Sequence, residues 1–241
     1  MKNTMLSQAA TLTRSLGIVV PFFLSVSAFA GTDQLSQSGA RPASEDGESV
    51  VLFSSLDALS DAAGLTAAFN VGTRAASTYP PNLLYQILYT GFDQTATNNT
   101  GGTYTTFIVK PGTRLYVPVI YNDNSLPIIG DFPPAGNRRA LLHYFHSQEE
   151  FGLVYARIVV DGTVATLGPH YVVEVSFPNP LPDGATLYQT IAAFLAPLRP
   201  GTHSVQITAL ATGEAFSIPP IDQYFPGGVF SFSTIYTVIV Q

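Results

Sequence analysis

The sequence predicts a mainly β protein, built as an antiparallel β-sandwich of immunoglobulin-like or jelly-roll-like type with one or two short helices. Three observations predict this class. The chain holds 20 Gly and 18 Pro residues, which favour turns, and 12 Tyr and 16 Phe residues, which favour strands. About seven runs of alternating apolar and polar residues follow one another along the chain. The turns between them are too short for parallel crossovers, which indicates antiparallel pairing.

The first 30 residues predict an export signal. Lys2 and Arg14 precede an apolar stretch over residues 16–26, and residues 28–30 (Ala-Phe-Ala) supply the small-x-small pattern that signal peptidases cut. We therefore expect cleavage after Ala30 and a secreted or periplasmic protein. The apolar stretch is shorter than the roughly 20 residues that a bilayer span needs, so no transmembrane anchor is expected after processing.

Composition excludes several classes of partner and site. Only 11% of the residues are charged. Loss of Lys2 and Arg14 with the signal would leave 8 of the 10 basic residues against 16 acidic ones, a net charge of -8. Nucleic acid is excluded as a partner because phosphate binding needs a basic footprint. The chain has 0 Cys, which excludes disulfides, thiolate metal sites and cysteine nucleophiles.

The region before the sandwich divides into two parts. Residues 31–49 contain almost no large apolar side chain and predict a flexible leader. Residues 50–102 predict an N-terminal region with a short helix and loops. Apolar residues recur at spacings of three and four over Val50–Asn70, and Gly64 and Gly72 limit the length of that helix.

The β-sandwich domain is expected over residues 103–241, where turn dipeptides alternate with strand patterns. Residues 103–109 and 114–121 flank Pro111-Gly112 and predict a hairpin or a strand pair. The next strand places Val154, Ala156, Ile158 and Val160 on one face. Asp161-Gly162 follows it as a turn signal.

Four more strands complete the predicted sandwich. They cover residues 171–177, 191–198, 202–209 and 233–240, and the second of these is apolar on both faces, as in a central strand. Pro200-Gly201 is expected to form the turn before the third. His203 then lies on the apolar phase of that strand, which predicts a core histidine hydrogen-bonded to the backbone.

One segment inside the sandwich domain has helical periodicity. Arg138–Phe151 predicts a single amphipathic helix packed on or beside the sandwich, with a strand over 140–146 as the alternative. Its apolar face holds Leu141, Tyr144, Phe145 and Phe151, and its polar face holds Arg139, His143, His146 and Glu150.

The polar face of this helix carries the candidate metal ligands. His143, His146 and Glu150 are spaced i, i+3 and i+7, which places imidazole and carboxylate groups on one side of a helix. The order lacks the His-Glu-x-x-His general base. A solvated polar face is the competing interpretation.

Other chemistries have weaker support. The sequence contains no Gly-x-Ser-x-Gly elbow, no Ser-x-x-Lys motif and no phosphate-binding loop. Carboxylates distant in sequence are candidates for glycosidase-like pairs, among them Asp131, Glu174 and Asp222. His170 follows Pro169 at a strand start and is expected to be exposed. Tyrosines are candidates for contact with a glycan or a protein surface, among them Tyr116, Tyr121, Tyr155 and Tyr224, with the strand faces and core as their other expected location.

Several segments carry a resemblance to a known group of proteins. They are Val109–Val119 (Val-Lys-Pro-Gly-Thr-Arg-Leu-Tyr-Val-Pro-Val), 159–162 (Val-Val-Asp-Gly), Leu195–Val205, which contains Pro-Gly-Thr-His, and 235–238 (Ile-Tyr-Thr-Val). Together they resemble a group of secreted bacterial β-sandwich proteins in which a Pro-Gly-Thr-His turn enters a strand and a Tyr-Thr-Val strand ends the domain. That group has no established activity, so the resemblance implies a fold and no catalytic residues.

The sequence thus favours an exported, non-enzymatic binding or structural protein of unknown ligand, without a cofactor. Its partner is expected to be a glycan or a protein surface. The alternative is a secreted hydrolase assisted by a divalent metal, with His143, His146 and Glu150 as ligands together with a residue from elsewhere in the chain.

Overall fold

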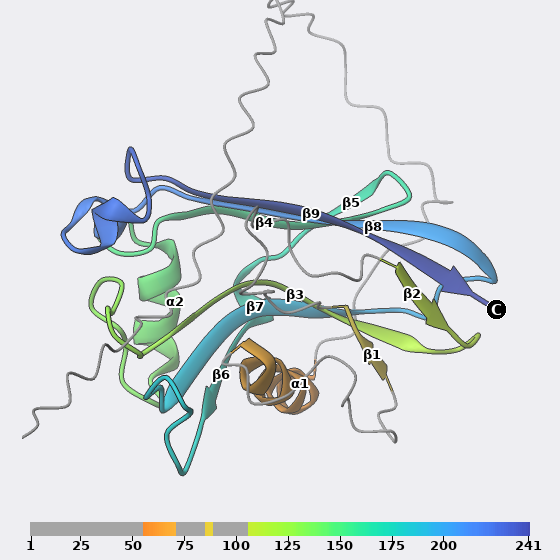
Figure 1. Ribbon diagram of the computed structural model, residues 1–241, viewed down its shortest axis with the longest axis horizontal. Coiled ribbons are helices and arrows are strands. Elements are labelled where there is room, and N and C mark those ends of the chain that lie inside the picture. Colours follow the sequence, from red (N-terminus) through yellow and green to blue (C-terminus); the bar gives the residue numbers. More distant parts are fainter. Residues whose placement is uncertain (1–54, 71–84, 89–105) are drawn as a thin grey trace, which may run out of the picture.

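A computed structural model describes residues 55–70, 85–88 and 106–241, and places nine strands of these ranges in two packed sheets (Figure 1). The four-stranded sheet has the order β1 (Tyr85–Ile87), β3 (Arg114–Asp123), β7 (Leu187–Leu195), β6 (Val172–Ser176). The five-stranded sheet has the order β2 (Thr106–Val109), β9 (Phe230–Val240), β8 (Gly201–Ala211), β4 (Leu153–Val160), β5 (Thr163–Thr166). The mainly β sandwich expected from the sequence is confirmed.

The alternating strand patterns produce the core between the sheets. In β8, Val205, Ile207 and Ala209 are buried, while the residues between them are partly exposed. All but the first residue of β7 are buried, which confirms that this strand is central. Val154 differs from expectation, because a bulge between Leu153 and Tyr155 shifts the pleat of β4 and leaves it 53% exposed.

Two strand pairings differ from the antiparallel scheme. β2 and β3 form neither the expected hairpin nor a strand pair, because the turn at Pro111-Gly112 carries the chain from the five-stranded sheet to the four-stranded one. Val109 and Leu115 therefore meet in the core between the sheets. β2 pairs in parallel with β9, and β1 in parallel with β3. The remaining pairings are antiparallel.

The helix α1 (Leu56–Asn70) covers the outer face of the four-stranded sheet (Figure 1). Leu59 and Ala63 lie in a second hydrophobic cluster with Tyr188 and Phe194 of β7. The helix runs through Gly64, which was expected to limit it. A Cβ at Gly64 would lie 3.5 Å from Val175 of β6, so this residue lies close against the sheet.

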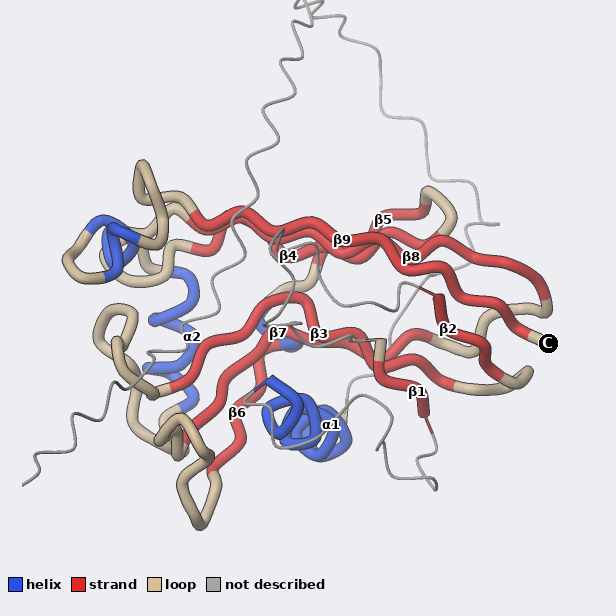
Figure 2. Tube along the Cα trace, in the orientation of Figure 1, coloured by secondary structure: helices blue, strands red, loops and turns tan. Residues whose placement is uncertain are grey.

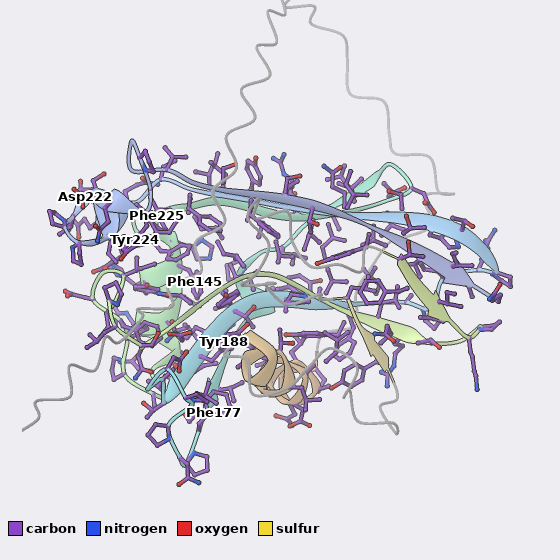
Figure 3. All side chains as sticks on the ribbon, viewed as in Figure 1. Phe145, Phe177, Tyr188, Asp222, Tyr224 and Phe225 are labelled. Atoms are coloured by element: carbon purple, nitrogen blue, oxygen red, sulfur yellow. The ribbon has the colours of Figure 1, made fainter. Side chains whose placement is uncertain are left out.

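The helix α2 (Arg138–His146) lies at one end of the sandwich, where loops and short 3-10 helices also gather (Figure 2). The 3-10 helices at this end are η3 (Glu214–Ser217) and η4 (Ile221–Gln223), whereas η2 (Pro169–Tyr171) directly precedes β6. Leu141, Tyr144 and Phe145 are buried, as the apolar face predicts. Phe145 points into the space between the sheets, whereas Tyr188 lies on the side of α1 (Figure 3).

The helix is shorter than the expected Arg138–Phe151. It ends at His146, since Ser147 is extended and its N–H donates to the His143 carbonyl. The chain then folds back so that the Phe151 N–H donates to the Tyr144 carbonyl at 3.1 Å, and the Phe145 and Phe151 rings lie 5.2 Å apart. Helical periodicity extended to Phe151 because the returning turn buries this ring against the same apolar face.

No helix among the described residues is long and apolar enough to cross a membrane. The expected export signal at 1–30 and the leader at 31–49 lie outside the described residues, as do residues 50–54, 71–84 and 89–102 of the expected N-terminal region.

Candidate binding cleft

A cleft of about 460 Å³ opens between α2 and the loop that precedes it. Its lining consists of charged, amide, aromatic and proline side chains: Asp131, Phe132, Pro133, Pro134, Asn137, Arg139, Ala140, His143, Tyr144 and Glu150. The volume lies within the roughly 300–1,000 Å³ typical of small-molecule sites. We call this feature the α2 cleft.

One stripe of α2 forms the first wall of the cleft. Arg139 and His143 are four residues apart, so they lie one turn above the other on the same face. The Asn137 side chain caps the helix by accepting the Ala140 N–H at 3.1 Å. Arg138 is directed elsewhere, because its guanidinium donates to the carbonyls of Val172 and Pro169. These two contacts fix the helix so that Arg139 lines the cleft.

Tyr144 attaches the second wall, the loop 129–134, to the helix. Its hydroxyl donates to the Ile129 carbonyl at 2.7 Å and accepts a hydrogen bond from the Asn122 side chain. Burial raises the pKa of the Tyr144 hydroxyl far above its ordinary value, so the group stays protonated and remains a donor. The Phe132 ring lies 5.7 Å from the Tyr144 ring and continues this wall.

Glu150 attaches the same loop from the turn that follows α2. Its Oε2 accepts the Asp131 N–H at 2.8 Å. Gly130 makes this approach possible, since it has φ +63° and a Cβ there would lie 2.3 Å from Glu150 Oε2. Glu150 and Tyr144 thus hold the loop at two adjacent points.

Three polar side chains in the cleft have no hydrogen-bond or ion-pair partner among the residues that the structure describes. They are Asp131 of the loop and Arg139 and His143 of α2, and all three are exposed. The cleft therefore presents a carboxylate, a guanidinium and an imidazole, and other contacts hold the loop and the helix that carry them. Such an arrangement can orient a polar ligand.

The predicted metal ligands are only partly brought together. His143 and Glu150 line the α2 cleft, whereas His146 does not. Because the helix ends at His146, Glu150 does not occupy the i+7 position of a continuous helix. His146 is an exposed residue, and the partial burial that its side chain retains lowers its pKa. Within 55–70, 85–88 and 106–241, no three His, Asp or Glu side chains are grouped closely enough to hold a metal ion.

His203 lies at the other predicted feature, the turn at Pro200-Gly201. Its Nδ1 lies 2.6 Å from Asp161 Oδ2 and its Nε2 lies 2.8 Å from the Arg199 carbonyl. The expected backbone bond is present, but the side chain is 16% exposed and belongs to neither hydrophobic cluster, so the predicted core location of His203 is wrong. Asp161-Gly162 forms the expected turn between β4 and β5, with φ angles of +49° and +88°. The link between this turn and His203 was not predicted.

The other candidates lie elsewhere. Glu174 accepts the Gly136 N–H and the Gln189 side-chain amide, and Asp222 is exposed on η4 outside the cleft. Asp131 alone among the proposed distant carboxylates lines the cleft. His170 is exposed, as expected. Tyr116 is fully buried beneath α1, so its suggested surface contact is wrong.

Sequence reasoning missed the loop wall of the cleft. Phe132, Pro133 and Pro134 fall between periodic segments and carry no strand or helix signal. The available signal was their position directly before the polar face of α2, where an aromatic ring and two prolines would form a stiff wall.

No protein-family model, curated protein or solved structure matches this chain.

Proposed function

We propose that this chain is an exported, non-enzymatic binding protein that holds a small polar ligand in the α2 cleft. The observation that carries the proposal is that Asp131, Arg139 and His143 line one cleft without partners among the described residues. Polar groups held on a rigid frame bind a ligand without first losing contacts of their own, which lowers the free-energy cost of association.

The contacts of Glu150 support binding over turnover. Its carboxylate accepts the Asp131 N–H and thereby holds the cleft wall in place. An acid or a nucleophile must be able to reach the substrate, and a structural hydrogen bond competes with that role. Export is supported by the sequence pattern of residues 1–30.

A thermal-shift screen of the protein recovered from an expressing host tests the proposal, with disaccharides, dipeptides and polyols as probes. At about 100 times its dissociation constant, a ligand stabilises the fold by about 2.7 kcal/mol. Ala140→Phe places a ring inside the cleft and should abolish the shift. Ala135→Phe, at an exposed position outside the cleft lining, is the matched control and should keep it. If no probe shifts the midpoint, or if Ala140→Phe leaves the shift intact, the proposal is wrong.

A second candidate is a hydrolase assisted by a divalent metal. His143, Glu150 and Asp131 line the same cleft, and imidazole and carboxylate groups are the ligands such metals take. Among the described residues these three side chains are not grouped closely enough to hold a metal ion as they stand, so metal binding would have to draw them together. EDTA should then lower the thermal midpoint, and zinc, calcium or manganese should restore it. Equal metal content in the wild type and a His143→Ala/His146→Ala double variant would reject this candidate.

A further inference from the structure

Opposite charges line the α2 cleft without neutralising one another. Arg139 belongs to the helix wall, whereas Asp131 and Glu150 belong to the loop and the returning turn. No nitrogen of Arg139 lies within 4.0 Å of a carboxylate oxygen of the described residues. His143 adds an imidazole on the helix wall, whose ring N–H can donate a hydrogen bond to a ligand.

The frame keeps these charges apart. Arg138 anchors the start of α2 to the carbonyls of Val172 and Pro169, and Glu150 holds the backbone of Asp131. Arg139 and Asp131 are both exposed, and an ion pair between exposed groups contributes little stability, so little draws the two side chains together. Their separation therefore leaves space for a ligand that contacts both.

Apart from the Asn137 amide and the Tyr144 hydroxyl, the rest of the lining is apolar. Phe132, Pro133 and Pro134 line the loop wall, and Ala140 and the Tyr144 ring line the helix wall. A cleft of about 460 Å³ has the volume of about 15 water molecules at roughly 30 Å³ each. The ligand that matches these surfaces is small, carries one charge of each sign and has an apolar part between or beside them.

We infer that the α2 cleft takes a short zwitterionic peptide, whose carboxylate contacts Arg139 and His143 and whose ammonium group contacts Asp131. This inference rests on the proposed function and names its ligand class. Charge-assisted hydrogen bonds to a planar carboxylate suit the guanidinium, and an ammonium group suits a carboxylate acceptor. A neutral saccharide would leave Arg139 and Asp131 without countercharges, which makes it the weaker match.

Calorimetric titration with L-alanyl-L-phenylalanine tests the inference, beside its N-acetyl derivative, its C-terminal amide and maltose. The free dipeptide should bind, and blocking either end should weaken binding at least about tenfold, the effect of losing one charge-assisted contact. Equal binding of the free and both blocked dipeptides would overturn the inference.

Substitutions of Arg139 and Asp131 test which end of the dipeptide each residue contacts. Arg139→Gln should weaken binding of the free dipeptide about tenfold and leave binding of the amide unchanged, because the amide has already lost the carboxylate. Asp131→Asn should weaken the free dipeptide in the same way and leave the N-acetyl derivative unchanged. Lys110→Gln and Asp222→Asn remove exposed charges outside the cleft and are the controls, with unchanged affinity expected.

Failure of the zwitterion inference can be distinguished from failure of the proposed binding function. Binding of maltose that Ala140→Phe abolishes, without binding of the dipeptide, would overturn the zwitterion inference and support the proposed binding function. No binding of the dipeptide by the folded protein would also overturn the inference. The proposed function itself fails when the wider thermal-shift panel gives no response, or when Ala140→Phe leaves the shift intact.

Discussion

His203 and Asp161 join two turns at one end of the five-stranded sheet, with 2.6 Å between Nδ1 and Oδ2. Asp161 Oδ1 also accepts the Ser204 N–H at 2.8 Å, so the carboxylate spans the start of β8. The second ring nitrogen of His203 faces the Arg199 carbonyl. Both partners of the ring are acceptors, and only a protonated imidazolium can donate to both. The geometry therefore favours the charged form of His203.

Stability should depend on pH through this contact. The hydrogen bond with Asp161 outweighs partial burial and raises the pKa of His203 above its ordinary value near 6.5. A group whose pKa is raised on folding contributes stability below its unfolded pKa and loses it as the pH rises through its folded pKa. The thermal midpoint of the wild type should thus exceed that of His203→Ala by roughly 2–4 °C below about pH 6, the effect of about 1 kcal/mol in a domain of this size. The difference should shrink towards pH 9.

Thermal melts of the two proteins across this pH range make the measurement. His170→Ala removes an exposed histidine of the same protein that lies outside this contact, and serves as the control variant. A gap between wild type and His203→Ala that stays constant at every pH would show that the ring contributes packing alone.

The Asp161–His203 contact also marks the limit of what the sequence predicts. Local patterns placed the Asp161-Gly162 turn and the strand that begins near His203, because turn chemistry and period-two alternation act over a few residues. Their meeting depends on the register of β4 against β8, which pairs Val160 with Val205. That register is set by packing between distant segments, and the pattern of either strand alone does not contain it.

The same reasoning explains the other differences. The Pro111-Gly112 turn was identified, but a turn signal does not say whether the chain stays in one sheet or crosses to the second. The two parallel pairs, β1 with β3 and β2 with β9, join segments that are far apart in the chain. In the cleft, the helix face with Arg139 and His143 followed from helical spacing, whereas the contact of Glu150 with the Asp131 backbone is a tertiary contact outside any local pattern.

The role of Glu150 as a structural acceptor predicts different outcomes for two substitutions. Glu150→Gln keeps an oxygen that can accept the Asp131 N–H, so stability and ligand affinity should stay near wild type. Glu150→Ala removes this acceptor from an exposed contact, where water can partly replace it, and should lower the free energy of unfolding by about 0.5–1.5 kcal/mol. Chemical denaturation measures both. Equal destabilisation by the two variants would contradict the prediction, because it would show that the carboxylate charge, and not an acceptor oxygen alone, holds the loop.

The export signal predicts a defined mature mass. Protein recovered from the medium or periplasm of an expressing host should lack residues 1–30 and begin at Gly31, because Ala28-Phe29-Ala30 supplies the cleavage pattern. Intact-mass spectrometry reads this directly. Replacing Ala28 and Ala30 with bulky residues should block processing, and a recovered wild-type protein that retains residues 1–30 would contradict the prediction.

The turn that carries Glu150 into the cleft depends on a close backbone approach at Gly213. The N–H groups of Thr212 and Gly213 donate to the carbonyls of Gly152 and Phe151, and a Cβ at Gly213 would lie 1.9 Å from the Glu150 carbonyl oxygen. Because the obstacle is backbone, a rotamer change cannot relieve it. Gly213→Ala should therefore lower the free energy of unfolding by about 3 kcal/mol, in the upper part of the range for overpacking. The thermal midpoint should fall by roughly 6–12 °C.

Gly168→Ala is the matched control for this last prediction. Both glycines have negative φ, at -67° for Gly213 and -93° for Gly168, so neither substitution strains the backbone dihedrals. A Cβ at Gly168 would meet nothing within 4 Å. Gly168→Ala should leave the midpoint near wild type, whereas Gly213→Ala should lower both the midpoint and the affinity of the α2 cleft, since displacement of the turn moves Glu150 away from Asp131. Similar midpoints for the two variants would mean that the approach at Gly213 is looser than the structure gives it.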